Sequence, residues 1–264
     1  MFPAAVVRHA FALCLLLGLT AGQNWTAVNS LGPSAVNPAV KGVAMVVSGT
    51  DHLLVGITPT QMLIHFNDTT QQWEQTESAS KLKVTFLTSC ADGTVWLLDT
   101  AGKVYRQHLT FPPLVEIPTV PNKTFSQLAG KDKDIASAVA TTGEVYRYKD
   151  GNWTQLPGNI TAKQLAMGSD GVILALDDQG RLMEHIADDW VEMMGGMNGT
   201  GFDVYNRAGN RIVITNQDHE VLMYADDLWL PIESPVPSGC KDVSISLNEV
   251  FCVTADFQVY RIKT

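Results

Sequence analysis

The chain has 264 residues, of which 45% are hydrophobic and 17% charged, and its net charge is −9. This length is enough to bury one large core or two small ones. The acidic balance, without a Lys/Arg cluster, argues against nucleic acid and anionic membranes as partners.

The first 22 residues have the pattern of a secretory signal peptide. Arg8 and His9 precede an apolar run at 10–19, and small residues at 20–22 lead to the expected cleavage point. A membrane anchor is the alternative, but a spanning helix needs about 20 apolar residues. No later stretch is long and apolar enough, so we expect no transmembrane segment and place the mature domain at 23–264.

Six Asn-x-Thr sequons follow, none with Pro in the middle. One sequon is a weak motif, but several after a signal peptide predict a glycosylated, secreted, extracellular protein. The predicted glycosylation sites are Asn24, Asn67, Asn122, Asn152, Asn159 and Asn198.

A short strand pattern recurs about every 40 residues along the chain. The copies lie at 62–65, 102–106, 143–147, 180–184, 219–223 and 257–261. An apolar strand precedes each copy, a further strand precedes that one, and most copies are followed by a turn and a Trp-x-x-apolar strand. Four short strands per repeat are typical of a β-propeller blade, so six copies predict an all-β, six-bladed propeller.

The hairpin at 144–158 is the best-preserved copy. Tyr146 and Tyr148 are strand formers, and Asp150, Gly151 and Asn152 form the turn before the next strand.

The two ends of the chain predict how the ring closes. The last repeat stops at Thr264 without its Trp strand, and the segment at 24–28 has the missing Trp-x-x-apolar pattern. An open stack of sheets would leave two exposed edges. We therefore expect the N-terminal strand to complete the last blade of a single propeller.

The pattern Trp-x-x-apolar-x-Gly, an apolar strand and Gly-x-Val-Tyr-Arg resembles the tectonin repeat. The best matches lie at 102–106, 143–158 and 180–195, whereas the first and fifth copies lack the Gly and the Tyr-Arg pair. The family includes tachylectin-1, fish-egg lectins and the tachylectin-like chain of an apple-snail egg perivitellin toxin. The resemblance implies a six-bladed lectin, often of innate defence, that binds glycans of glycoproteins or glycolipids. In the snail toxin a disulfide joins the lectin chain to a pore-forming chain.

Aromatic side chains of the repeat are the candidate carbohydrate-binding residues, because sugars stack their C–H faces on rings. The candidates are Tyr105, Tyr146, Trp153, Trp190 and Trp229. The same rings also fit a purely structural role, packed between neighbouring blades.

No motif predicts a metal, a cofactor or catalysis. The acidic pairs at 188–189 and 226–227 fall in turns, where Asp is ordinary, and the histidines show no paired ligand spacing. Cys-x-x-Cys and Gly-x-Ser-x-Gly are both absent from the sequence. We therefore expect a non-catalytic protein without a cofactor.

Removal of Cys14 with the signal peptide leaves three cysteines. A tight hairpin around 248–249 would place Cys252 opposite Ile245, so a Cys240–Cys252 disulfide requires an irregular hairpin. We expect this pair nonetheless, with Cys90 left over at an exposed turn. Such a thiol is compatible with an interchain disulfide to a second, pore-forming chain.

The sequence thus predicts a secreted carbohydrate-binding lectin, or the glycan-targeting subunit of a disulfide-linked egg defence toxin. The alternative is a structural or storage glycoprotein of eggs or body fluid without a specific ligand.

Overall fold

The computed structural model describes 25–28, 42–48, 51–67, 69–70, 72–76, 79–108, 111–193, 198–206, 211–225, 228–234, 237–246, 248–256 and 258–263. The predicted signal peptide at 1–22 and Asn24 lie outside the described residues. No helix in the described part is long and apolar enough to cross a membrane.

Six four-stranded antiparallel sheets form the fold, and each sheet is one blade. The first blade contains β2 (Gly42–Ser48), β3 (Asp51–Ile57), β4 (Leu63–Asn67) and β5 (Gln72–Gln75). The second contains β6 (Val84–Ser89), β7 (Thr94–Asp99), β8 (Val104–His108) and β9 (Phe111–Ile117). The third contains β10 (Phe125–Gly130), β11 (Ile135–Ala140), β12 (Val145–Lys149) and β13 (Asn152–Gln155).

The fourth blade contains β14 (Ala162–Met167), β15 (Ile173–Asp177), β16 (Leu182–Ile186) and β17 (Asp189–Glu192). The fifth contains β18 (Gly199–Asn206), β19 (Arg211–Asn216), β20 (Val221–Ala225) and β21 (Leu228–Ile232). The sixth contains β22 (Asp242–Ile245), β23 (Glu249–Val253), β24 (Val259–Lys263) and the N-terminal β1 (Thr26–Ala27).

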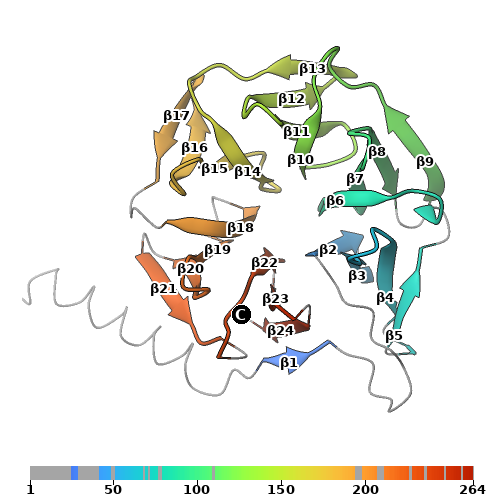
Figure 1. Cartoon of the computed structure of the whole chain (residues 1–264), viewed down its shortest axis with the longest axis vertical. Helices are drawn as coiled ribbons and strands as arrows, with labels where there is room; N and C mark the ends of the chain where they lie inside the picture. Colours follow the sequence, from blue (N-terminus) through green and yellow to red (C-terminus); the bar gives the residue numbers. More distant parts are fainter. Residues whose placement is uncertain are drawn as a thin grey trace, which may run out of the picture.

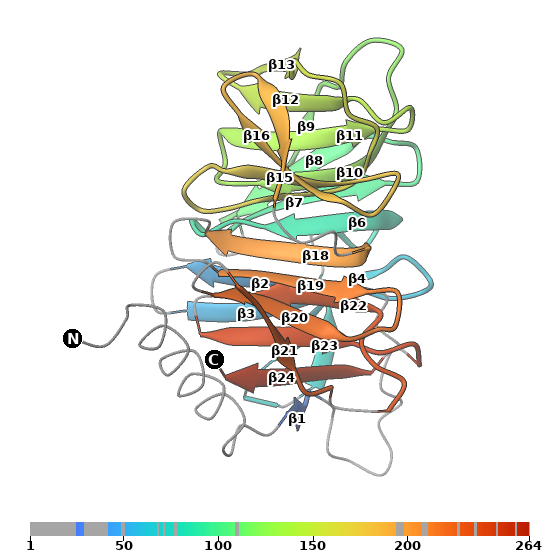
Figure 2. The same ribbon diagram turned by 90° about the vertical axis from the view of Figure 1, so that its left-hand side faces the viewer.

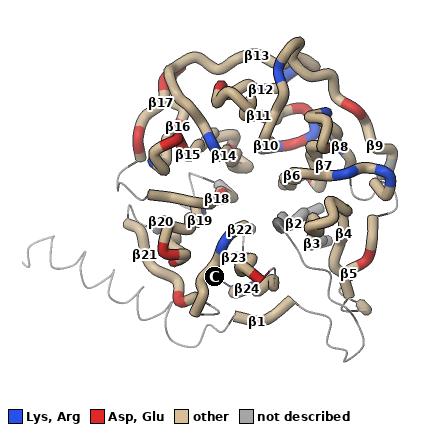
Figure 3. The backbone as a smooth tube through the Cα atoms, viewed as in Figure 1, with Lys and Arg blue, Asp and Glu red and all other residues tan. Residues whose placement is uncertain are grey.

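The blades stand around a central axis, with the first strand of each blade innermost (Figure 1). Figure 2 shows the strands running along this axis. Acidic and basic residues are interspersed around the ring instead of gathering on one side (Figure 3). The prediction of an all-β, six-bladed propeller is therefore confirmed.

The N-terminal strand closes the ring as predicted. Thr26 lies opposite Arg261 and Ala27 opposite Tyr260, so β1 is the outer strand of the sixth blade. The indole of Trp25 also donates a hydrogen bond to a backbone carbonyl in the linker before that blade. Two ends of the chain thereby share one sheet, which removes the open edges that an unclosed ring would expose.

The turn between the second and third strands of a blade repeats one local design. Asp99, Asp177 and Asn216 each accept hydrogen bonds from the backbone N–H groups two and four residues further on. Gly102 and Gly180 follow in the left-handed conformation, with φ of +77° and +76°. Asp and Asn form such side-chain turns readily, and Gly adopts positive φ without steric cost.

Four of the innermost strands contain a bulge at their second residue. The register shifts at Thr85, Ser126, Lys163 and Thr200. The hydroxyls of Thr85, Ser126 and Thr200 donate to carbonyl groups of the neighbouring strand. The bulges therefore bend the inner strands, and the hydroxyls at three of them still have hydrogen-bond partners.

Buried apolar side chains of the described residues form six clusters, one between each pair of neighbouring blades. Trp96 is fully buried between the second and third blades, and its Nε1 donates to the Asp132 carbonyl at 3.0 Å. The core is thus divided among the blade interfaces, which leaves the axis free for a channel.

Candidate functional site

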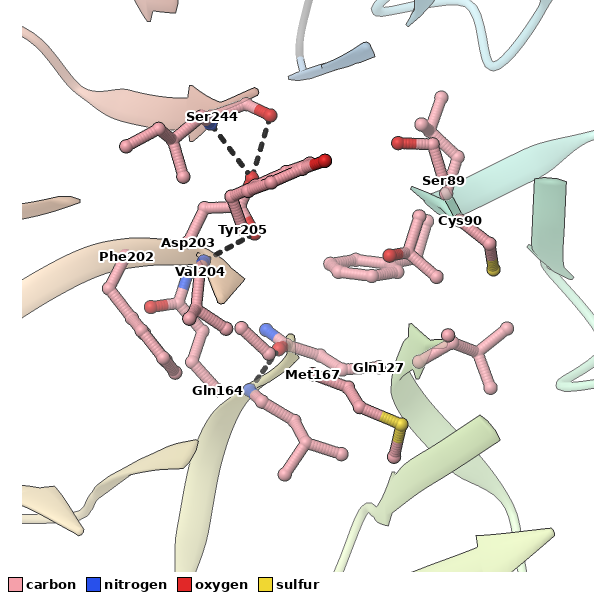
Figure 4. A pocket seen from close by; sticks show the side chains of 18 of the residues that line it. Ser89, Cys90, Gln127, Gln164, Met167, Phe202, Asp203, Val204, Tyr205 and Ser244 are labelled. Atoms are coloured by element: carbon pink, nitrogen blue, oxygen red, sulfur yellow. Dashed lines mark hydrogen bonds between the residues drawn. The ribbon is translucent and has the colours of Figure 1, made fainter. Parts of the chain in front are cut away.

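A cavity of about 390 Å³ lies on the axis, where the innermost strands meet. Figure 4 shows side chains of several blades converging on it. Its lining contains many polar residues. Polar lining residues come from five blades and include Thr85, Thr88, Ser89, Ser126, Gln127, Lys131, Gln164, Ser169, Asp203, Tyr205, Asp242, Ser244 and Ser246.

Asp203 ties the fifth blade to the sixth. Its Oδ2 accepts hydrogen bonds from Ser244 Oγ at 2.7 Å and from the Ile245 N–H at 3.0 Å (Figure 4). Its Oδ1 accepts from the Val204 N–H at 2.8 Å. Burial raises the pKa of this carboxyl, and the three donors only partly oppose that effect.

Asp242 is the second carboxyl of the channel and is less well satisfied. Within the described part of the chain it accepts one hydrogen bond, at 3.0 Å, from the N–H of Val243. Burial raises its pKa to about 6, and the nearby Asp203 charge raises it too, whereas Lys241 acts in the opposite direction. Asp242 therefore changes charge close to neutral pH.

Two amides line the wall at a register position equivalent to that of Asp242. Gln127 Oε1 accepts a hydrogen bond from the Leu165 N–H of the next blade at 3.2 Å. Gln164 Oε1 is shielded from solvent and accepts no hydrogen bond from the described residues. A buried amide oxygen without a donor is costly, and because this atom is shielded from solvent a ligand in the channel does not reach it in this conformation.

The end of the channel away from Asp242 is lined by the Tyr205 ring and the Lys131 side chain. Tyr205 lies at the end of β18 and projects into the space between the blades (Figure 4). Its backbone carbonyl accepts a hydrogen bond from the Ser169 N–H of the fourth blade at 2.7 Å. The aliphatic stem of Lys131 lies 3.5 Å from the point where a Cβ would stand on Gly171. This mouth thus offers a ring face, hydroxyls and an ammonium group.

Among the described residues, no group of three or more His, Cys, Asp or Glu side chains is placed to hold a metal ion. The channel instead gathers hydroxyl, amide and carboxyl groups. Such groups recognise a ligand that itself has several hydrogen-bond donors and acceptors.

The structure does not bring the five aromatic candidates together. Tyr105, Tyr146 and Trp190 are only 9%, 5% and 8% exposed. Trp153 and Trp229 are half-buried on the outer strands of different blades. The burial of Tyr105, Tyr146 and Trp190 fits the structural role, in which the rings pack between neighbouring blades.

Trp153 shows the structural role of these rings. Its Nε1 donates to the Pro118 carbonyl in the linker from the preceding blade at 2.9 Å. Its ring contacts Phe125 and Tyr148, with centroids 4.9 and 5.2 Å apart. The ring locks its blade against the incoming linker, as Trp25 does in the sixth blade.

Cys240 and Cys252 form the expected disulfide, with Cα atoms 5.5 Å apart. The predicted register of that hairpin is wrong, because Cys252 lies opposite Val243 and not Ile245. Cys240 precedes the paired residues of β22, where it reaches Cys252 from outside the ladder.

The prediction that Cys90 lies exposed at a turn is also wrong. The thiol is free, and the residue is only 4% exposed. Gly130 of the next blade makes room for it, since a Cβ there would stand 2.5 Å from the sulfur. Burial raises the pKa of the thiol well above its usual range, which keeps it protonated and unreactive.

Four predicted glycosylation sites are exposed: Asn122, Asn152, Asn159 and Asn198. Asn67 is half-buried, and its side chain already bonds Glu74 and the following turn. Three of the exposed sites lie in linkers that join successive blades, at the same end of the ring.

Sequence reasoning missed the channel residues Gln127, Gln164, Asp203, Tyr205 and Asp242. They lie in separate repeats, so no local spacing connects them. The available signal was a polar residue in the first strand of a repeat, in a strand otherwise rich in apolar residues.

No protein-family model and no curated protein sequence matches this chain. Solved structures do match it. Virginiamycin B lyase from Staphylococcus aureus has a TM-score of 0.61 and 12% identity, covering 92% of this chain and 100% of that chain. A protein of unknown function from Bacteroides thetaiotaomicron has a TM-score of 0.69 and 10% identity, covering 92% of this chain and 76% of that chain. YCF48 from Cyanidioschyzon merolae has a TM-score of 0.58 and 14% identity, covering 91% and 85%. At these identities the likeness shows the propeller fold alone.

Proposed function

We propose that this chain is a secreted glycoprotein that binds carbohydrate without catalysing a reaction, and that the ligand occupies the central channel. The observation behind the proposal is the channel lining, in which amide, hydroxyl and carboxyl groups of five blades face one cavity of about 390 Å³. A sugar presents several hydroxyl groups that both donate and accept hydrogen bonds. The Tyr205 ring adds an apolar surface beside these groups.

The resemblance of the repeat to the tectonin repeat supports the same function, because that family consists of carbohydrate-binding propellers. Glycans of glycoproteins or glycolipids are accordingly the proposed partners. Exposure of four sequons supports a glycosylated chain that passes through the secretory pathway. Glycans at Asn122, Asn159 and Asn198 would cover parts of the end of the ring where the linkers between blades run. They would leave open the other end of the channel, where Tyr205 lies.

We do not extend the proposal to a disulfide-linked, pore-forming partner. That link required an exposed Cys90, and the structure buries this thiol between two blades. Reaching a second chain would require the second and third blades to separate.

A glycan array tests the proposal, with the whole chain produced in eukaryotic cells and displayed multivalently so that weak sites are detected. We expect binding by the wild type and a loss of at least about tenfold in Tyr205→Ala and Gln127→Ala, because each removes a group that lines the channel. Trp153→Phe is the matched control, since it alters an outer strand and should retain binding.

Absence of wild-type binding to any glycan would refute the proposal and favour the storage or structural glycoprotein. If Trp153→Phe abolished binding while the two channel variants retained it, the ligand would lie on the outer strands instead.

A further inference from the structure

Three blades have an arginine at the same position of their third strand, directly after the Val-Tyr pair of the repeat. These residues are Arg106, Arg147 and Arg261. The valines two positions earlier are buried in the apolar cluster between their own blade and the next. Because side chains alternate along a strand, each arginine points into the junction with the next blade.

The arginines of the second and sixth blades have acidic partners, whereas that of the third blade has none. Arg106 forms an ion pair with Asp134 at 3.7 Å, and Arg261 forms one with Glu249 at 4.0 Å. The Arg147 side chain makes no hydrogen bond or ion pair with the described residues, and its Nε is shielded from solvent. Its terminal nitrogens are not shielded, so they remain open to an anion.

The loop between the first two strands of the next blade explains this difference. The same backbone hydrogen bond closes the loop in both blades, from 131 to 135 in the third and from 168 to 172 in the fourth. Gly171 therefore stands where the third blade has Asp134, the partner of the preceding arginine. The fourth blade thus offers no carboxylate at the point towards which Arg147 is directed.

A second cation lies at the same point. Lys131 Nζ is 3.8 Å, and its Cδ 3.5 Å, from the place where a Cβ would stand on Gly171. An acidic side chain beginning there would meet Lys131 and also, as Asp134 does in its own junction, the arginine of the preceding blade. Lys131 forms no ion pair with the described residues. Asp170 of the same loop accepts a backbone hydrogen bond at 3.3 Å within its own turn and pairs with neither cation.

This point lies beside the channel. Lys131 and Ser169 line the cavity at the end where Tyr205 projects into it (Figure 4). The Ser169 N–H donates to the Tyr205 carbonyl at 2.7 Å, and Gly171 follows two residues later in the same loop. A sugar ring beside Tyr205 would therefore have this loop as a neighbour, with Lys131 on the way to Arg147.

We propose that the preferred ligand of the channel is an acidic sugar, whose carboxylate lies over Gly171 between the Lys131 ammonium and the Arg147 guanidinium. The sugar rests on the proposed function, whereas the anion site rests on the two cations and on the glycine that replaces an aspartate. Charge-assisted hydrogen bonds to a carboxylate are stronger than bonds between neutral groups, and the guanidinium fork matches its geometry. A neutral sugar of the same shape leaves both cations without a partner.

Calorimetry with the whole chain at pH 7 and low salt tests this site with two matched pairs, glucuronate with glucose and galacturonate with galactose, and with acetate. We expect the acidic member of at least one pair to bind at least about tenfold more tightly, a difference of about 1.4 kcal/mol. The preference should shrink as salt is added, because salt screens partly exposed charges.

Substitutions identify the cations. Arg147→Gln and Lys131→Gln should each reduce the preference for the acidic sugar severalfold, and Arg147→Lys, which keeps the charge, should retain part of it. Arg261→Gln is the matched control, because it removes the same charge from the equivalent position of the sixth blade, where Glu249 is the partner. This control should keep the full preference.

Equal affinities within both pairs, or no measurable binding of either acidic sugar, would overturn the inference, as would a preference that survives in Arg147→Gln. A positive glycan array together with one of these results would refute the anion site and leave the proposed function standing. Acetate binding that depends on Arg147, without binding of any sugar or glycan, would refute the proposed function and support the anion site.

Discussion

Substitution of Asp242 by Asn should make the propeller more stable at neutral pH. The folded state raises the pKa of this carboxyl to about 6, chiefly because burial disfavours its charged form. The unfolded chain releases the proton near pH 4, so the folded state binds more protons between about pH 4 and 6. The contribution of Asp242 to stability is therefore fully present below pH 4 and is lost as the pH rises through 6.

The size of this effect follows from the pKa difference. Each pKa unit corresponds to about 1.4 kcal/mol, so a shift of roughly two units sets a ceiling of about 3 kcal/mol. Asp242 keeps part of its surface open to the channel, where solvent screens the charge. We therefore expect Asp242→Asn to raise the free energy of unfolding at pH 7 by about 1 to 2 kcal/mol.

Urea denaturation of the wild type and the variant at pH 4, 5, 6 and 7, followed by tryptophan fluorescence, measures this difference. The gain should be close to zero at pH 4 and should reach its full value above pH 6. Asp188→Asn, in an exposed turn, should show no such pH-dependent gain. A variant less stable than the wild type at pH 7, or a gain independent of pH, would refute the reasoning.

Three further substitutions test the construction of the blades. Asp177→Ala should lower the free energy of unfolding by about 2 to 3 kcal/mol in urea denaturation, because the 2.7 Å bond from Arg181 Nε and two backbone bonds are lost; an unchanged midpoint would contradict this role. Gly180→Ala should cost about 1 to 3 kcal/mol by the same assay, since φ is +76° there, and a neutral effect would show that the turn relaxes. Replacing Cys240 and Cys252 together by Ser should cost about 3 kcal/mol, as their disulfide closes a loop with a sequence separation of 12; thermal unfolding that matches the wild type would argue against the cross-link.

The blades and the ring closure could be predicted because their signals are local and repeated. Strand formers, turn residues and the Trp-x-x-apolar pattern each act over a few residues and recur about every 40. The strand around Thr26 could be assigned to the last blade because that blade alone lacked its fourth strand. The disulfide was predicted, whereas the register of its hairpin was not. The hairpin turns one residue earlier than 248–249, because Ile245 pairs with Val250 and the Ser246 N–H donates to the Glu249 carbonyl.

The candidate site could not be predicted, because every blade contributes a different residue to it. Gln164 and Asp242 are 78 positions apart in the numbering and lie at one level of the channel only because their strands are equivalent. The burial of Cys90 likewise depends on the next blade, where Gly130 leaves space for its sulfur.

The sequence by itself determined the number of blades, the turns within them and the strand that closes the ring, because short-range backbone preferences and side-chain alternation decide these features. Only the tertiary structure decided which side chains are buried between blades and which reach the axis. Tyr105 and Tyr146 belong to the first group, and Asp203 and Asp242 to the second. The physical reason is that burial depends on the neighbouring blade, whose residues are distant in the chain.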